Sequence, residues 1–488
     1  MRKPIQELKK DALVILLFAL LSVGMIYPLI THITDHVPSD LGDPLYNVWV
    51  MARQFHELKA GLKNFWDGNI FYPHKSTLLY ADYLFAEAVM GAPLAAISNN
   101  FIFVHNVLYI FSFFICALGM YFLVFYLTRS RISALIGGLV FAFFPYRFAH
   151  ISHLELLSFG WIPLCFLFLH KFFDSPSYKN LAGIGFFYVL QALSCAYYSV
   201  FLALFAGLFI VYFAFKKKFY QRSDFWFKMG ILSITCLIVL FPFYYPYIKV
   251  HQKMSFIRSL KEVNFYSAQI QHFLSVPVWN VAWGWLIGNQ GSPEWQVYPG
   301  IMAVFLTIYW WISRRNVRAA EIREEGNKTF ICWDLITALY LFFILQVVHS
   351  GGFSLHWAGV KWLSMHSMRN PLIILAISLS LRIVLAIRKR RNLKKVIPST
   401  ISLAQRFYFF LAILACLLSL GPEIRYLGRM LLAGPYLALY EWIPGFQGLR
   451  VPSRFVVMMM FGISLLAGLG AALWDSSHLR TGHQRARY

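Results

Sequence analysis

Asp43 stands in a short polar run, Gly42-Asp43-Pro44, that follows the first apolar stretch of the chain. Aspartate is a favoured N-cap and proline fits the first helical turn, so the run predicts a helix start capped by Asp43. A carboxylate fixed at a membrane surface could also take the proton of an acceptor hydroxyl as a general base. The two roles are compatible, because a cap holds its carboxylate in place.

Two other aspartates could share this chemistry. Asp40 lies three residues before Asp43, and Asp82 lies in the apolar stretch 78–97, which also carries Glu87. Asp82 could act as a second acid or a metal ligand, or it could be a solvated charge on an interfacial helix. Since carboxylates are costly at the bilayer centre, we interpret 78–97 as interfacial or re-entrant rather than spanning.

Basic side chains form two further candidate groups. Arg147, His150 and His153 recur every third residue, which predicts that they lie loosely along one helix face at the outer interface. Such a group suits an anionic headgroup, because arginine makes bidentate contacts with phosphate. Arg450 and Arg454 precede the last apolar stretch and could bind the phosphate of a lipid carrier or a phospholipid headgroup. Arginines that merely snorkel to the interface, and a weak His-x-x-His metal pair, are the alternatives.

The elements that must position these residues are membrane helices. Of the 488 residues, 59% are hydrophobic and only 13% are charged, and mean hydropathy is +0.59, which excludes soluble enzymes, secreted disulfide scaffolds and disordered regulators. The net charge of +23 reflects cytoplasmic loops rather than a nucleic-acid partner. No phosphate-binding glycine loop, dinucleotide fingerprint or zinc spacing occurs, so no soluble nucleotide-binding domain is expected.

Hydropathy predicts an all-α, polytopic membrane protein with about twelve spans in one integral-membrane domain and no separate soluble domain. The stretch 181–215 is too long for one span and should break near 195–199. The positive-inside rule places both termini in the cytoplasm of a plasma (inner) membrane protein and the long loops outside. The spans are 12–30, 101–127, 132–146, 155–172, 180–195, 197–215, 229–248, 298–313, 330–348, 371–387, 402–420 and 455–474, and the long loops are about 31–100, 249–297, 349–370 and 421–454.

These outer loops carry most of the polar and aromatic complexity. Loop 249–297 is rich in tryptophan, tyrosine and phenylalanine. Sugars stack on aromatic rings, but aromatic belts at membrane interfaces are commoner, so the loop only permits a carbohydrate ligand. The functional chemistry is therefore expected at the extracytoplasmic face, within interfacial helices of these loops.

Four motifs, taken in order, resemble the GT-C superfamily of integral-membrane glycosyltransferases. They are Gly42-Asp43-Pro44-Leu45 with Trp49, Phe71-Tyr72-Pro73, Pro145-Tyr146-Arg147 with His150 and His153, and Gly448 to Phe455. The resemblance implies transfer of a sugar from a polyprenyl-phosphate donor to a glycan, lipid or protein acceptor, with inversion. It carries the catalytic carboxylate onto Asp43 and phosphate binding onto the basic motifs. Better-known members often have two adjacent acids in the first loop. Here Pro44 follows Asp43, so Asp40 or Asp82 would have to supply the second acid.

The cofactor and the function class are left open at this stage. A divalent metal ion is compatible with the resemblance, with Asp82 and the weak His150–His153 pair as the candidate ligands. The alternatives to a glycosyltransferase are a transporter or flippase of lipid-linked glycans and a polymerase or ligase of surface polysaccharide. An outward-facing pocket beside Asp43 that opens sideways to lipid would favour the enzyme. A cavity open alternately to both membrane faces would favour the transporter.

Overall fold

The computed structural model describes residues 2–254, 257–280, 284, 291–317, 353–357, 360–365 and 399–474. Contacts divide the chain into two units, 1–310 with 400–488, and 311–399. Every candidate residue named above belongs to the first unit. The predicted spans 330–348 and 371–387 lie outside the described residues.

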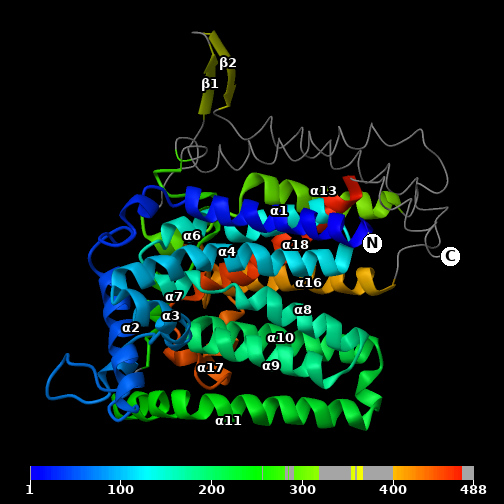
Figure 1. The fold of residues 1–488 in the computed structure, drawn as a ribbon. Helices are drawn as coiled ribbons and strands as arrows, with labels where there is room; N and C mark the ends of the chain where they lie inside the picture. Colours follow the sequence, from blue (N-terminus) through cyan, green and yellow to red (C-terminus); the bar gives the residue numbers. More distant parts are fainter. Residues whose placement is uncertain are drawn as a thin grey trace. The chain divides into compact units, whose positions relative to one another are not determined.

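Helices dominate the described part of the chain (Figure 1). The long ones are α1 (Arg2–Gly24), α2 (Asp43–Ala60), α3 (Phe85–Ser98), α4 (Phe101–Thr128), α5 (Arg131–Ala142), α8 (Trp161–Asp174), α9 (Tyr178–Ser194), α10 (Ala196–Lys216), α11 (Ser223–Met254), α13 (Ile301–Val317), α16 (Ser399–Ser419) and α18 (Val456–Trp474). The short ones are α6 (Pro145–Ala149), α7 (Leu154–Leu157), α12 (Leu260–Phe265), α17 (Tyr436–Trp442), and the 3₁₀ turns η1 (Leu29–His32), η2 (Thr77–Tyr80), η3 (Phe219–Gln221), η4 (Ile270–Leu274), η5 (Pro293–Trp295), η7 (Phe446–Gly448) and η8 (Pro452–Phe455).

Six helical segments in the described residues are long and apolar enough to cross a membrane. They are Phe101–Thr128, Arg131–Ala149, Leu154–Asp174, Ala196–Lys216, Ser223–Met254 and Pro452–Ala472. Four shorter apolar helices, Asp11–Gly24, Phe85–Ser98, Ile301–Trp311 and Leu403–Ser419, accompany them. The composition and length of these helices are those of a membrane-embedded helical protein, whereas the predicted number of twelve spans stays a prediction.

The structure agrees with the sequence on the two stretches that were not read as single spans, 181–215 and 78–97. The long stretch breaks where expected, because α9 ends at Ser194, Cys195 is extended (φ −151°, ψ 120°) and α10 begins at Ala196. The stretch 78–97 forms no single helix. Its helix α3 has 14 residues and is about 21 Å long, which is too short for a hydrocarbon core of about 30 Å.

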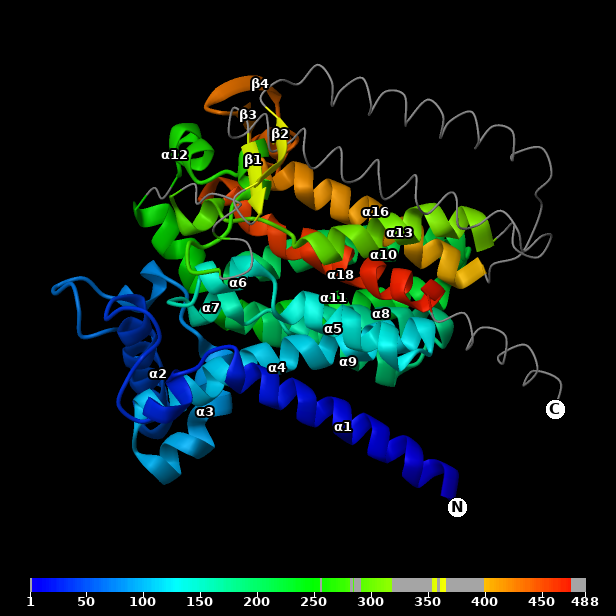
Figure 2. The same cartoon turned by 90° about the horizontal axis from the view of Figure 1, so that it is seen from above.

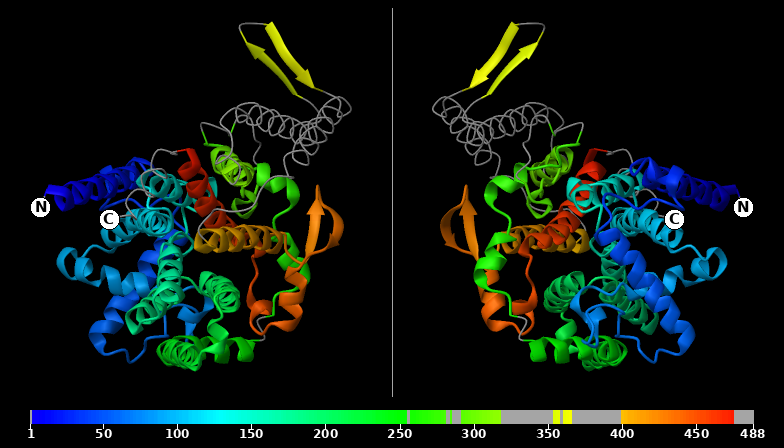
Figure 3. Two further views of the ribbon diagram at one scale, coloured as in Figure 1. Left: turned by 90° about the vertical axis from the view of Figure 1, so that its right-hand side faces the viewer. Right: turned by 90° about the vertical axis from the view of Figure 1, so that its left-hand side faces the viewer.

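Helix α4 lies at the centre of the first unit and packs against α1, α5, α8 and α18. Figure 2 shows α1 along the outside of α4, and Figure 3 views the helices nearly along their axes. Glycines permit the close approach of α5 to α4. A Cβ on Gly138 would lie 2.7 Å from the carbonyl oxygen of Ala117 and 2.7 Å from the ring of Phe18. Small residues bring membrane helices together in this way, because van der Waals packing drives their association.

Two small hairpins depart from the all-α prediction. β3 (Glu423–Tyr426) pairs antiparallel with β4 (Arg429–Ala433) in the loop 421–454. β1 (Phe353–Trp357) pairs antiparallel with β2 (Val360–Met365) in the second unit. Both hairpins fall in predicted long loops, where a two-stranded ribbon satisfies backbone groups that a loop would leave to water.

Several helices begin or end together at one end of the first unit. α4 begins, α6 ends, and α7, α10 and α18 begin there, and α2 and α3 gather beside them at the left of Figure 1. The first loop is tied to this end because Asn106 Nδ2 donates to the carbonyl oxygens of Ile33 and His36, at 2.9 and 2.7 Å. We call it the site end. The opposite end, where α4, α8 and α10 terminate at Thr128, Asp174 and Lys216, is the far end.

Candidate functional site

Asp40, and not Asp43, shapes the turn before α2. The helix begins at Asp43, its N-cap is Gly42, and no side chain caps it. Instead, Asp40 Oδ1 accepts the backbone N–H of Gly42 at 2.7 Å, which is an Asx-type turn. This bond, aided by one from the Ser152 hydroxyl, lowers the pKa of Asp40. The prediction that Asp43 is the cap is therefore wrong, because Asp40 already organises the turn.

Because Asp43 does not cap the helix, its carboxylate can pair with a histidine. Its Oδ2 lies 3.1 Å from His153 Nε2, and 59% of its side chain is exposed. Asp40 Oδ2 accepts from Ser152 Oγ at 2.9 Å, so both carboxylates of the first loop bind the segment 150–153 between α6 and α7. Asp43 also lies in the first turn of α2, where the helix dipole favours a negative charge.

The basic motif after α5 does not follow one helix face. α6 ends at Ala149, so His150 and His153 occupy a turn. Their rings lie 5.8 Å apart, and the ring of His150 lies 4.2 Å from that of Tyr146. Burial lowers the pKa of His150 to about 4 against the opposing effect of Glu294, so its imidazole is neutral at pH 7.

Glu294, in η5, accepts four hydrogen bonds at the site, although no sequence motif singled it out. Its Oε1 accepts from Arg454 Nε and Nη2 at 3.0 and 2.9 Å, and its Oε2 accepts from Tyr146 and Ser453 at 2.9 and 3.1 Å. His150 Nε2 lies 3.6 Å from Oε2. Burial opposes ionisation, but Arg454, His150 and the hydrogen bonds outweigh it and lower the pKa of Glu294 to about 2. The one available signal was an acid within Ser292-Pro293-Glu294, a turn sequence in an aromatic loop.

Arg454 is consequently not the free outer-face cation that the sequence predicted. Its side chain is buried, its charge is balanced by Glu294, and its guanidinium lies 4.4 Å above the ring of Tyr197. The turn of η8 directs it inward, because the neighbouring Ser453 binds the same carboxylate. Arg454 therefore ties loop 249–297 to the start of α18, and its guanidinium is not exposed for phosphate binding.

Arg147 was also predicted at the outer interface, but the structure buries it. Its side chain has no exposure, and its guanidinium lies 4.0 and 4.6 Å from the ring centres of Phe113 and Phe159. Nη2 donates to Ser112 Oγ at 3.2 Å. The short helix α6 turns Arg147 toward α4 while His150 faces Glu294. Arg147 therefore packs the interior and does not join the histidines.

Asp82 caps a helix at the same end of the molecule. Its Oδ1 accepts the N–H of Ala196, the first residue of α10, at 2.9 Å. Burial raises the pKa of Asp82, against the opposing effects of this bond and of Arg454. Burial, together with the negative charges of Asp82 and Asp43, raises the pKa of Tyr46 in α2 to about 12. Asp82 thus belongs to the acid-rich site end, where its hydrogen bond supports α10.

Two remaining contacts complete the polar cluster. Asn47 Nδ2, one turn after Asp43 on α2, donates to Glu155 Oε2 at 3.0 Å. Arg450 keeps 40% of its side chain exposed, with its guanidinium 4.8 Å above the ring of Tyr266 and its Nε 4.0 Å from Glu262. Of the five basic residues singled out from the sequence, Arg450 has the guanidinium that is open to solvent at this end.

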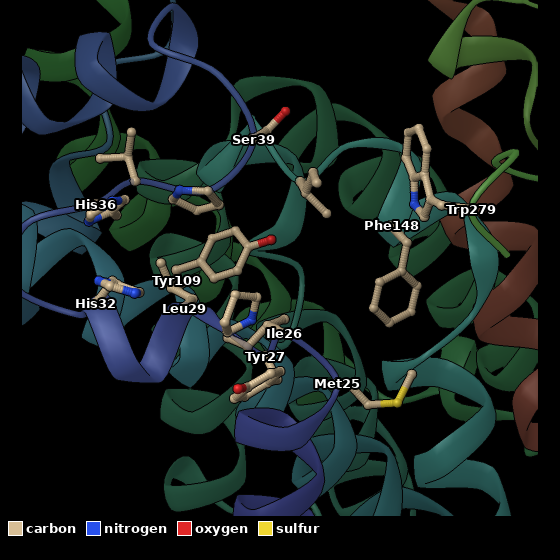
Figure 4. Close-up of a pocket in the computed structure, with 14 residues that line it drawn as sticks. Met25, Ile26, Tyr27, Leu29, His32, His36, Ser39, Tyr109, Phe148 and Trp279 are labelled. Carbon is tan, nitrogen blue, oxygen red and sulfur yellow. The ribbon is translucent and has the colours of Figure 1, made fainter. Parts of the chain in front are cut away.

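A cavity of about 370 Å³ adjoins this cluster (Figure 4). One wall is formed by residues 25–29, which follow α1, and by the segment 36–39, which leads directly to Asp40. The other includes Phe148 and Ile151, which flank His150 in the chain, and Trp279 of loop 249–297. Its lining is mostly apolar. Asp43 does not line the cavity but follows Ser39, the last lining residue of this wall, by four positions.

The cavity is bordered by the residues best suited to hold a metal ion. Ligand atoms of His32, Asp35 and His36 all lie within 4.8 Å of one another, and both histidines face the cavity. Within the described ranges this is the one group of three such side chains. Two imidazole nitrogens and a carboxylate suit zinc or a similar divalent ion with one position left open. These residues could hold a divalent ion, and they are not the candidates that the sequence offered, Asp82 or the His150–His153 pair.

Comparison with known proteins gives no neighbour. No protein family, no curated protein and no solved structure matches this chain.

Proposed function

We propose that this protein is a membrane glycosyltransferase that moves a sugar from a polyprenyl-phosphate donor to an acceptor hydroxyl at the extracytoplasmic face, with inversion. The observation that carries the proposal is the Asp43–His153 pair. It combines a carboxylate exposed by 59% with an imidazole partner at 3.1 Å, and the two residues closely follow Ser39 and Ile151, which line an apolar cavity. A general base needs both properties, since it must reach solvent-borne substrate and hold one orientation.

In this proposal the acceptor oxygen bonds to the anomeric carbon as the bond from that carbon to the donor phosphate breaks. The hydroxyl proton passes to Asp43. His153 holds Oδ2 of Asp43 and leaves Oδ1 to receive that proton. The Glu294–Arg454 pair acts indirectly. Through Tyr146 and His150 it fixes the turn on which His153 stands, so that the carboxylate is preorganised.

The site end offers an apolar surface for the prenyl chain or sugar of the donor and a cation for its phosphate. The apolar cavity suits part of a prenyl chain or the hydrophobic face of a sugar, for which Trp279 is a ring available for stacking. Arg450 is an exposed cation for the donor phosphate. A divalent ion at His32, Asp35 and His36 would supply additional positive charge beside the cavity.

The cluster's position favours an enzyme over a transporter. Asp43, His153, Glu294 and Asp82 all lie at helix ends or in loops. Transporters of polar or lipid-linked substrates instead place such groups at broken helices near mid-membrane. A transporter therefore remains the alternative that the activity test must exclude.

The test is transfer by the purified protein in nanodiscs with a panel of radiolabelled polyprenyl-phosphate sugars. Release of free polyprenyl phosphate, with label passing to water or to an added membrane extract, is expected for one donor. Asp224→Asn is a matched control, since Asp224 is 60% exposed, pairs with Lys228 at 3.0 Å and lies at the far end. Loss of turnover in Asp43→Asn but not in this control supports the proposal. Donor that changes leaflet without losing its sugar would identify a flippase instead.

A further inference from the structure

A second cavity lies at the far end of the molecule, away from the candidate site. It measures about 360 Å³ and runs between α4 and α8. Six of its eight lining side chains are aromatic or leucine, among them Phe122, Phe125 and Leu164, and the other two are Arg129 and Lys171. Phe122, its lining residue nearest the start of α4, lies about 32 Å along the helix from Phe101 at the site end, so the role of this cavity is independent of the proposed catalysis.

The two cations converge on one aromatic ring. The Arg129 guanidinium lies 5.3 Å, and Lys171 Nζ 5.9 Å, from the ring centre of Tyr126, and Lys171 Nζ is also 4.7 Å from that of Phe168. In the part of the chain that the structure describes, neither cation has a carboxylate within ion-pair distance. The adjacent Asp174 is bonded to Lys217 Nζ at 2.7 Å and to the Tyr126 hydroxyl at 2.8 Å, so its charge is already balanced. This second cavity, which we call the groove, therefore keeps an uncompensated positive charge.

Both cations stand where two candidate spans end. Arg129 directly follows Phe101–Thr128, and Lys171 lies in the last turn of Leu154–Asp174. The aromatic part of the groove then faces the hydrocarbon, and the cations lie at headgroup depth. Phe122, which is exposed within the span, extends the apolar surface toward the bilayer. Cations at the end of an apolar groove between membrane helices match a phosphate attached to an acyl chain.

We propose that this groove binds one anionic phospholipid, such as phosphatidylglycerol or cardiolipin. An acyl chain lies along Phe122, Phe125 and Leu164, and the phosphate lies between Arg129 and Lys171. Arginine offers paired N–H donors and lysine a point charge, and the aromatic platform keeps both in place. A zwitterionic lipid carries its own ammonium beside the phosphate, so it binds this cationic end more weakly.

The experiment is native mass spectrometry of the detergent-purified full chain titrated with phosphatidylglycerol, cardiolipin or phosphatidylcholine. The test variant is Arg129→Asn with Lys171→Gln. Asparagine is chosen because Arg129 has a φ of 58°, a conformation that asparagine tolerates. The control is Lys216→Gln with Arg222→Gln, which removes two exposed charges from the same end but none from the groove.

The test variant should lose at least tenfold in affinity for the first bound phosphatidylglycerol and little for phosphatidylcholine. The control should stay within about twofold of wild type. Equal losses in both variants would mean diffuse surface attraction, and unchanged affinity in the test variant would mean no site; either result overturns the proposal. If Lys171→Gln prevents folding, the single variant Arg129→Asn is measured instead, with an expected loss of about threefold in affinity. This variant should fold, because Arg129 is exposed and, among the described residues, its guanidinium packs on the Tyr126 ring.

Discussion

Two carboxylates at the site end show how residues of one type take different roles through their surroundings. Asp43 is exposed and touches one imidazole, whereas Glu294 is buried and receives four hydrogen bonds. The first can exchange protons with a substrate. The second is held ionised by Arg454 and serves to fix its neighbours, as buried ion pairs do when every lone pair is satisfied.

Asp43→Asn is expected to lower sugar-transfer turnover by roughly 10²–10⁴-fold while folding and donor binding survive. Asparagine keeps the size of the side chain and a hydrogen-bond acceptor for His153 but cannot accept the proton. The measurement is single-turnover transfer with donor binding followed separately. A near wild-type rate in Asp43→Asn beside an inactive Asp40→Asn would transfer the role of base to Asp40. Full activity in both variants would refute the catalytic hypothesis.

Glu294 should make stability depend on acidity. Because its folded pKa of about 2 lies below the ordinary value of 4.5, the stabilisation is complete above pH 4.5 and is lost as pH falls toward 2. Its size is up to about 3 kcal/mol. Thermal unfolding, followed by loss of monodisperse protein at pH 7 and pH 3.5, should show this loss in wild type. Glu294→Gln should be less stable at pH 7, since Arg454 loses its counter-charge, and less sensitive to pH. An identical pH profile in the two proteins would argue against this assignment.

At the scale of elements, short helices and turns bring distant segments together. The α6–α7 turn receives Asp40 and Asp43 from the first loop, and η5 delivers Glu294 from residues far along the chain. Asp82 accepts the backbone N–H of Ala196 at the start of α10, where a helix dipole favours a negative charge. The site is thus assembled by helix ends rather than along any one helix.

Removing the carboxylate of Asp82 tests this assembly. Asp82→Ala should lower the free energy of unfolding by about 1 kcal/mol, as the loss of a helix cap does. Asp82→Asn keeps an acceptor oxygen and should retain both stability and turnover. The comparison of unfolding midpoints and transfer rates for the two variants separates a cap from a catalytic acid. Inactivity of a stably folded Asp82→Asn would make Asp82 a catalytic group.

At the scale of the whole molecule, acidic and catalytic candidates lie at one end and the lysine- and arginine-rich turns at the other. Arg129, Arg131, Lys216 and Lys217 all lie at the far end. The positive-inside rule then predicts that the far end faces the cytoplasm and the site end faces the exterior. This orientation is the premise on which the proposed extracytoplasmic chemistry depends.

Single cysteines in a cysteine-free background test the orientation. A cysteine replacing the exposed Lys75, at the site end, should react with an impermeant maleimide in intact cells. A cysteine replacing the exposed Gln221, at the far end, should react only after permeabilisation. The corresponding loops 280–290 and 388–395, for which the sequence makes the same prediction, lie largely outside the described residues. Labelling of both positions in intact cells would invalidate the orientation.

The sequence by itself determined the helical membrane character and the break at Cys195, because hydropathy, charge and length act locally along the chain. It also selected the motifs that meet at the site end, including Asp43 and His153.

Tertiary structure decided which of the selected residues are available to a ligand. Burial among Phe113 and Phe159 removed Arg147, and a partner from another loop neutralised Arg454. Glu294 gained its importance in the same way. The contacts of Glu294 join residues more than a hundred positions apart, and those of Arg147 join separate helices and turns, so no local pattern encodes them. Residue spacing could indicate that charges were present near the outer face, but only packing decides whether a charge meets solvent, a ring or an opposite charge.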